Sequence, residues 1–282
     1  MPLALPELVR DSVNSHSKVL TTNEEVAALR PSSRLGMPKS LATDIKRSGI
    51  LLSQIAIHHI DRRVRLAFNI PSVENPPDDK AAILLAPGYF GPNAYLEKIA
   101  RTTYLPIIRH PYFDQMRLRG ELDQESAMYY ELLVKRQAPT IVIAHSRGGP
   151  TILKALKLLQ DAGKDDQVQA VILIAPISDG VRDEIAQVIR HIPSKTMREM
   201  CPGHPKLSSW QDLNTENRAK IVVITAQDGD LFTSKERGYV DGSTLVVADC
   251  HDGHLQQCLD PNSIMFETTI AIANAIGNQL RQ

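Results

Sequence analysis

The chain has 282 residues, enough for one large domain or two small ones at roughly 150 residues per domain. Hydrophobic residues make up 43% and charged residues 23% of it, which is typical of a folded globular protein and excludes a disordered or fibrous one. The 32 basic and 32 acidic residues balance. The sequence therefore shows no basic surplus of the kind that binds nucleic acid or an anionic membrane surface.

The cysteine count and the N-terminal sequence indicate a compartment. The chain has an odd number of cysteines without CxxC spacing, Cys201, Cys250 and Cys258. This predicts neither a disulfide framework nor a zinc site and favours a reducing compartment. No basic region followed by an apolar stretch opens the chain, and no segment reaches the ~18 apolar residues of a membrane helix. We therefore expect a cytoplasmic enzyme or binding protein without an integral membrane segment.

The first part of the chain has scattered turn formers and no sustained period. It predicts an N-terminal extension over residues 1–50, with one helix near Asn23–Leu29. Alternating apolar residues then predict two strands of a hairpin, Leu51–Ile60 and Val64–Ile70. A helix remains the alternative for Leu51–Ile60, because a short apolar run does not fix its own period.

From residue 81 onward, apolar runs alternate with helical patterns. The runs predict strands buried on both faces, and the helical patterns place apolar residues on one side. The predicted strands are Ala81–Ala86, Tyr104–Ile108, Thr140–Ala144, Val168–Ile177, Lys220–Thr225 and Ser243–Ala248, and the predicted helices include Glu121–Gln137, Thr151–Ala162 and Ile264–Leu280. This alternation predicts an α/β domain over residues 51–282, with a mostly parallel central sheet flanked by helices.

The most informative stretch is Thr140–Gly149, an apolar strand that runs into small residues and then a helix. It contains Ala144-His145-Ser146-Arg147-Gly148, a nucleophile-elbow pattern with Ala at the first small position. A serine on so sharp a turn needs small neighbours two residues away on each side, where chain segments pass closely. We expect Ser146 to be a nucleophile; the alternative is a serine that only caps the next helix.

A serine nucleophile needs a base, and the base needs an orienting acid. In the elbow arrangement these follow in the order acid, then histidine, each after a later strand. Asp228 follows the strand Lys220–Thr225 and His254 follows the strand Ser243–Ala248. We expect Asp228 and His254 in these roles, with Asp230 the competing acid and His251 the competing base.

Acyl transfer also needs hydrogen-bond donors for an oxyanion. Pro87-Gly88-Tyr89 follows the first buried strand, and its glycine allows close backbone approach. We expect the N–H groups of Tyr89 and Arg147 to form this oxyanion hole; a plain strand-to-helix connection is the alternative for the Tyr89 loop. No HExxH or paired-carboxylate spacing indicates a metal site.

With these residues placed, Leu51 to Leu280 resembles the α/β-hydrolase superfamily and, within it, the lipase-like serine esterases. The resemblance implies the α/β-hydrolase fold with an eight-stranded sheet, a Ser146, Asp228 and His254 triad, an oxyanion hole at Tyr89 and Arg147, and no cofactor. Pro87, where many members have His, and Ala144, in place of the first elbow Gly, depart from the family pattern.

The connection Asp179–Lys220 is longer than the about 2–6 residues and one helix that a strand connection needs. In the superfamily this position resembles a lid insertion, here residues 179–219. Trp210, Met197 and Met200 would then line a lid over an apolar acyl chain. The alternative is that these side chains pack against their own domain.

These features together predict a serine hydrolase that cleaves a small-molecule carboxylic ester, lipid-derived esters included, through an acyl-enzyme on Ser146. Two alternatives stay open. One triad serves thioesterases, lactonases and amidases as well, and a hydrolase fold also occurs in binding proteins without turnover.

Overall fold

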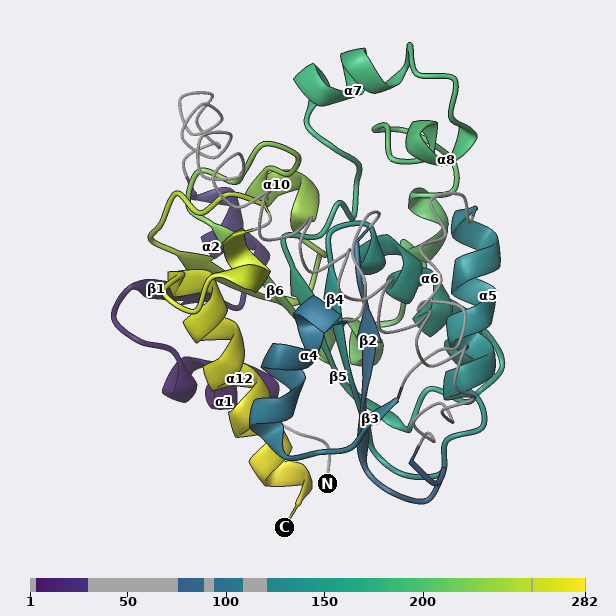
Figure 1. Ribbon diagram of the computed structural model, residues 1–282, viewed down its shortest axis with the longest axis vertical. Coiled ribbons are helices and arrows are strands. Elements are labelled where there is room, and N and C mark those ends of the chain that lie inside the picture. The colour runs from purple at the N-terminus through teal and green to yellow at the C-terminus, as the bar shows by residue number, and fades with distance from the viewer. Residues whose placement is uncertain (1–3, 30–75, 89–93, 109–120, 255, 282) are drawn as a thin grey trace, which may run out of the picture.

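The computed structural model describes residues 4–29, 76–88, 94–108, 121–254 and 256–281. Within these ranges seven strands form one sheet, in the order β1-β7-β6-β5-β4-β2-β3 (Figure 1). The strands are β1 (Ser17–Leu20), β2 (Ala82–Ala86), β3 (Ile107–Ile108), β4 (Thr140–His145), β5 (Val168–Ile174), β6 (Ile221–Ala226) and β7 (Thr244–Ala248). All neighbours pair in parallel except β1, which runs antiparallel to β7. The predicted mostly parallel sheet is confirmed.

The apolar runs form central strands because both faces of the sheet are covered. Every residue of β2, β4, β6 and β7 is buried. Side chains alternate along β2, so Ile83 and Leu85 join one core cluster while Leu84 and Ala86 join the other. Two apolar layers, one on each face, therefore hold the sheet.

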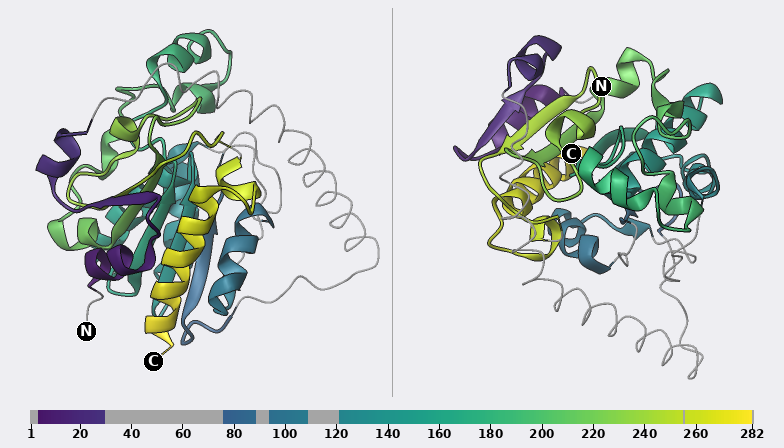
Figure 2. Two further views of the ribbon diagram at one scale, coloured as in Figure 1. Left: turned by 90° about the vertical axis from the view of Figure 1, so that its left-hand side faces the viewer. Right: turned by 90° about the horizontal axis from the view of Figure 1, so that it is seen from above.

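Among the described elements, three helices cover the first face and two long helices cover the second (Figures 1 and 2). The first set is α1 (Leu5–Ser12), α4 (Ala94–Ala100) and α12 (Ile264–Leu280), and the second is α5 (Leu122–Leu133) and α6 (Gly148–Asp161). Shorter helices are α2 (Asn23–Ala27), α7 (Asp183–Ile189), α8 (Lys195–Arg198), α9 (Thr215–Ala219), α10 (Lys235–Gly238) and α11 (Gln256–Leu259), with 3₁₀ turns at Arg101–Thr103 and Ser208–Trp210. None of the helices in the described ranges has the length and apolar character needed to cross a bilayer.

The N-terminal segment contributes more than the predicted helix. Helix α2 lies where it was expected, begins with a capping box between Thr22 and Glu25, and follows the unpredicted elements α1 and β1. Leu5 and Val9 of α1 belong to the core of the first face. The predicted hairpin at residues 51–70 lies outside the described residues, and the division into an extension and a domain stays a prediction.

The long connection after β5 has a small core of its own. Ile177, Ala186 and Met200 belong to a third apolar cluster beneath α7 and α8. Trp210 instead joins the core of the second face and donates its Nε1–H to the carbonyl of Ser178, at 3.2 Å. The tryptophan therefore packs against the domain, and a lid at residues 179–219 stays a prediction.

Candidate active site

Ser146 lies at the tip of a sharp turn between β4 and α6. It has a φ of 54°, in the left-handed region that non-glycine residues rarely occupy. Its N–H donates to the carbonyl of Ile174 at 3.0 Å, and its own carbonyl accepts from Gly149 N–H at 2.9 Å. These bonds hold the strained residue in place. Among residues 140–150, Ser146 is the only one not fully buried, so the turn presents this side chain outward.

Glycines surround the turn because other strands pass close to it. A Cβ on Gly148 would overlap the carbonyl oxygen of Ala86, at the end of β2. A Cβ on Gly88 would lie 3.0 Å from the Cβ of Ser146. The small residues predicted around Ser146 are thus a steric requirement of the strand-to-helix crossing, and Gly88 brings the loop after β2 against the serine.

His254 and Asp230 form a buried pair at the ends of β7 and β6. The Nδ1 of His254 lies 2.8 Å from Oδ2 of Asp230, and the two residues are 5% and 1% exposed. A carboxylate only accepts hydrogen bonds, so Nδ1 carries the proton and Nε2 is left as an acceptor. The ring of Phe232 packs against His254 with 5.0 Å between centroids. This is the tautomer that a general base on serine requires.

The Asp230 carboxylate is held in its charged form by a set of donors. Its Oδ1 accepts from the N–H groups of Phe232 and Thr233, at 2.7 and 2.8 Å, and its Oδ2 accepts from Thr233 Oγ1 at 3.1 Å. Burial raises the pKa of Asp230, but the His254 charge and hydrogen bond and these backbone bonds outweigh it and lower the pKa to about 2. Asp230 is therefore a fixed, ionised partner for His254.

The acid predicted from the sequence, Asp228, does not contact His254. Its Oδ2 lies 3.1 Å from Nδ1 of His251, and that histidine is 47% exposed. The pairing therefore differs from the predicted one: His254 pairs with Asp230, and the competing base His251 pairs with Asp228. Gly229 has a φ of 69°, and this turn separates the two carboxylates so that only Asp230 enters the buried pair.

Gln257 was not predicted and completes the surroundings of the acid. It is fully buried on α11, and its Nε2 donates to Asp230 Oδ2 at 3.0 Å. The sequence could have indicated it, because a residue three positions after His254 lies about one helical turn further on and faces the same side. Gln257 thus shares one carboxylate oxygen with His254.

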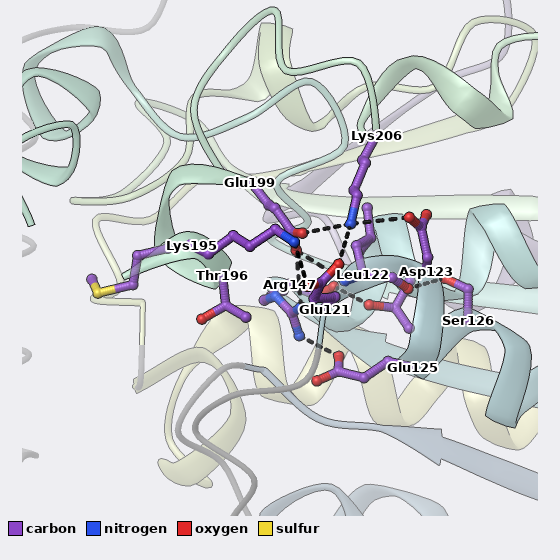
Figure 3. A network of polar contacts seen from close by, with 12 residues as sticks. Glu121, Leu122, Asp123, Glu125, Ser126, Arg147, Lys195, Thr196, Glu199 and Lys206 are labelled. Atoms are coloured by element: carbon purple, nitrogen blue, oxygen red, sulfur yellow. Dashed lines mark hydrogen bonds and ion pairs between the residues drawn. The ribbon is translucent and has the colours of Figure 1, made fainter. Parts of the chain in front are cut away.

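Of the two predicted oxyanion donors, Tyr89 lies outside the described residues. Arg147 is the N-cap residue of α6, so its N–H lies at the positive end of a 14-residue helix. Its side chain turns away into a buried network (Figure 3). There the guanidinium pairs with Glu125 and lies 3.8 Å from Glu199.

The same network joins α5 to the connection after β5 (Figure 3). Glu199 accepts from the N–H of Leu122 at 2.9 Å and from Nζ of Lys206 at 2.7 Å. Burial lowers the pKa of Lys206, but hydrogen bonds to Glu121, Glu199 and Asp123 raise it above its usual value overall. Lys206 is therefore charged, and the ion pairs tie the segment of α8 to the helix beside the elbow.

Neither of the nearby cysteines competes as a nucleophile. Burial raises the pKa of Cys250 and of Cys258, and the negative charge of Asp252 or Asp230 respectively raises it further. Both side chains are thus protonated thiols, which are poor nucleophiles. No group of three or more histidine, cysteine or carboxylate side chains in the described part of the chain is placed to hold a metal ion.

The strand order, the sharp turn at Ser146 after β4, and the loops after β6 and β7 that bring Asp230 against His254 have the arrangement of the α/β-hydrolase fold, as predicted. The described part of the sheet has seven strands, against the eight that the resemblance implies; the predicted hairpin at residues 51–70 lies outside the described ranges.

Comparisons with known proteins gave distant structural similarities alone. No family model matches the chain, and no curated protein matches it. Among solved structures, a metagenomic carboxyl esterase is 14% identical, with 75% of this chain and 78% of that one covered and a TM-score of 0.44. A Bacillus licheniformis lipase in mature form is 14% identical, with 66% and 90% covered and a TM-score of 0.47. Carboxyl esterase 2 of the fungus Tuber melanosporum is 12% identical, with 73% and 81% covered and a TM-score of 0.49.

Proposed function

We propose that this protein is a serine hydrolase that cleaves carboxylic esters through an acyl-enzyme on Ser146, with His254 as general base and Asp230 as the orienting acid. The observation that carries the proposal is the buried 2.8 Å pair of His254 and Asp230, formed at the same sheet edge as the strained Ser146 turn. A structural ion pair does not require a strained serine beside it, whereas acyl transfer uses both.

In the first step His254 Nε2 takes the proton of the Ser146 hydroxyl as its oxygen attacks the ester carbonyl carbon. The imidazolium that forms is stabilised by Asp230, which keeps its own negative charge. The negative charge on the former carbonyl oxygen falls near the N-terminus of α6, where the N–H of Arg147 and the helix dipole are the proposed stabilising groups. The N–H of Tyr89 remains the proposed second donor.

The bond to the leaving alcohol then breaks as His254 returns the proton to that oxygen. Water attacks the resulting acyl ester of Ser146 in the second half, again with His254 accepting and returning one proton. Acid and alcohol are the products, and the serine is regenerated. Alcohols are better leaving groups than amines, so this arrangement should turn over an ester more readily than the corresponding amide.

Replacement of Ser146 tests the proposal directly. We expect Ser146→Ala to abolish turnover of short p-nitrophenyl esters, because it removes the hydroxyl that is acylated and the nearby thiols of Cys250 and Cys258 are protonated. The matched control is Ser178→Ala, since the buried Oγ of Ser178 makes no hydrogen bond in the described part of the chain. The proposal is wrong if Ser146→Ala keeps the activity of the control. A panel of thioesters, lactones and amides then defines the preferred acyl group.

We also propose a cytoplasmic location, on the cysteines. Cys201, Cys250 and Cys258 are all free thiols, and unpaired cysteines are the rule in reducing compartments. Fractionation of the native host, with the protein detected by antibody, tests this location.

A further inference from the structure

His145, the residue just before Ser146, lies where three loops meet. It ends β4 and is 3% exposed. Its Nε2 lies 3.1 Å from the main-chain carbonyl oxygen of His254, and the two imidazole rings have centroids 4.6 Å apart. On its other side is the loop after β2, because a Cβ on Gly88 would lie 3.3 Å from His145 Nδ1. The nucleophile turn, the base loop and the glycine loop thus meet on one side chain.

The protonation of this imidazole follows from its contacts. A carbonyl oxygen only accepts, so the Nε2 of His145 must carry the proton and donate it. Burial, and then the charge on His254, lower the pKa of His145 to about 3, against the opposing effect of Asp230. His145 is therefore neutral at any pH where esters are assayed. A neutral ring beside His254 does not repel the imidazolium that forms during catalysis.

We propose that His145 is a positioning residue for the base: its Nε2–H holds the backbone of His254 against the nucleophile turn. This inference rests on the proposed function and adds a residue to it. Asp230 fixes the ring of His254 through Nδ1, whereas the Nε2–H of His145 acts on the main-chain carbonyl of the same residue. His145 adds a restraint on this backbone from the β4 side.

The location of the donor explains why this restraint bears on the chemistry. Ser146 and His145 are consecutive residues, so a shift of their turn moves both together. Through the hydrogen bond of His145, the same shift also moves the loop that carries His254. A misplacement of about 1 Å between reacting groups can cost about 10²-fold in rate. The hydrogen bond therefore maintains the Ser146 to His254 geometry, and its loss should reduce the chemical step while substrate binding is retained.

Two variants of equal length separate the donor from the packing. In His145→Gln the amide nitrogen lies as many bonds from Cα as the histidine Nε2 and can donate to the same carbonyl, whereas His145→Met fills similar space without a donor. We measure kcat and KM on a p-nitrophenyl ester, the rate of labelling by a fluorophosphonate, and thermal unfolding. His145→Phe, which keeps an aromatic ring against His254, replaces the Met variant if that variant does not fold.

We expect the donor-free variant to lose about 10- to 100-fold in kcat and in labelling rate, with KM within about twofold, and His145→Gln to recover most of the loss. Equal losses in the Gln and donor-free variants, an unchanged kcat, or an effect on KM alone would overturn the inference. These outcomes are distinct from failure of the proposed function, in which the wild-type protein itself neither turns over esters nor labels at Ser146.

Discussion

At the scale of single residues, Asp230 serves two purposes with one carboxylate. One oxygen closes a turn on the N–H groups of Phe232 and Thr233, and the other accepts from His254. The turn fixes the direction of the carboxylate without using the oxygen that faces the histidine. Such prior orientation is what lets an acid hold an imidazole in one tautomer through a reaction.

The two aspartates of this loop give a matched pair of variants. We expect Asp230→Asn to lower kcat on p-nitrophenyl esters by about 10⁴-fold, because the neutral amide no longer holds the Nδ1–H tautomer of His254 or stabilises its imidazolium. Asp228→Asn, which alters only the half-exposed contact with His251, should stay within a few-fold of wild type. Steady-state kinetics of both variants check this. The reverse ranking would restore Asp228 as the acid.

The sequence narrows the acid to Asp228 and Asp230 and favours Asp228, whereas in the structure it is Asp230 that contacts His254. Asp230 contacts both its own turn and His254, because a carboxylate has two oxygens with separate partners. The choice depends on which oxygen faces the end of β7, and that depends on the left-handed turn at Gly229 and not on sequence spacing.

Two buried groups at the site make the fold sensitive to acid. The pKa of His145 is lowered to about 3 and that of Asp230 to about 2, whereas in the unfolded chain the two groups have pKa values of about 6.5 and about 3.9. The unfolded state binds more protons in both cases, so stability is retained above the unfolded values and falls as the pH drops toward the folded ones. The windows are roughly pH 6.5 to 3 for His145 and roughly pH 4 to 2 for Asp230.

Urea unfolding at pH 7 and pH 5 checks the histidine contribution. One proton bound only by the unfolded chain costs about 1.4 kcal/mol per pH unit, so the wild type should lose about 2 kcal/mol more than His145→Gln over this range. Wild-type and variant curves that fall in parallel would show that His145 does not titrate on unfolding.

At the scale of elements, ion pairs fix α8 and the chain after it to α5 and the elbow. Glu199 is 1% exposed and contacts Arg147, Lys206 and the first N–H of α5. Glu121 contacts the same Lys206 at 2.8 Å from a more open position. The two carboxylates therefore share a partner and differ in burial.

Glu199→Gln and Glu121→Gln should accordingly have unequal effects. Loss of the buried Glu199 charge removes a partner from the buried Arg147 and from the partly buried Lys206, and we expect it to lower the free energy of unfolding by about 3 kcal/mol. The exposed pair of Glu121 is screened by water, so Glu121→Gln should unfold close to wild type. Urea denaturation of the two variants checks this prediction. Equal and small effects would mean that the ion pairs of Glu199 do not hold α8 and the chain after it against α5.

The elements that the sequence predicted best are those whose signal is local. The central strands, such as Thr140–His145, appear as unbroken apolar runs because helices cover both faces. Strand β1 was missed since only one of its four residues is buried, and its identity comes from pairing with β7, more than two hundred residues away. A partner so distant leaves no pattern in the short segment itself.

At the scale of the whole molecule, the N-terminal segment stabilises the sheet. Leu5, Val9 and Leu20 are at most 1% exposed, and β1 covers the outer edge of β7. Burial of three such side chains contributes about 5–9 kcal/mol as an upper estimate. That is comparable with the roughly 5–15 kcal/mol that holds a typical protein folded.

Deletion of residues 1–22 should therefore remove most of the stability and expose the edge of β7 to pairing with other chains. Thermal unfolding and size-exclusion chromatography of the truncated protein check this. The double variant Leu5→Ala with Val9→Ala, which keeps β1, should be affected less. A truncated protein that melts like the full chain and stays unassociated would contradict this role.

The central claim is that Ser146 is a nucleophile activated by the His254 and Asp230 pair. The most direct measurement is peptide mass mapping of the protein after reaction with a fluorophosphonate. We expect one phosphonyl adduct, on the peptide that carries Ser146, and its loss when His254 is replaced by Gln. An adduct on another residue, or equal labelling of Ser146 without the imidazole, would contradict it.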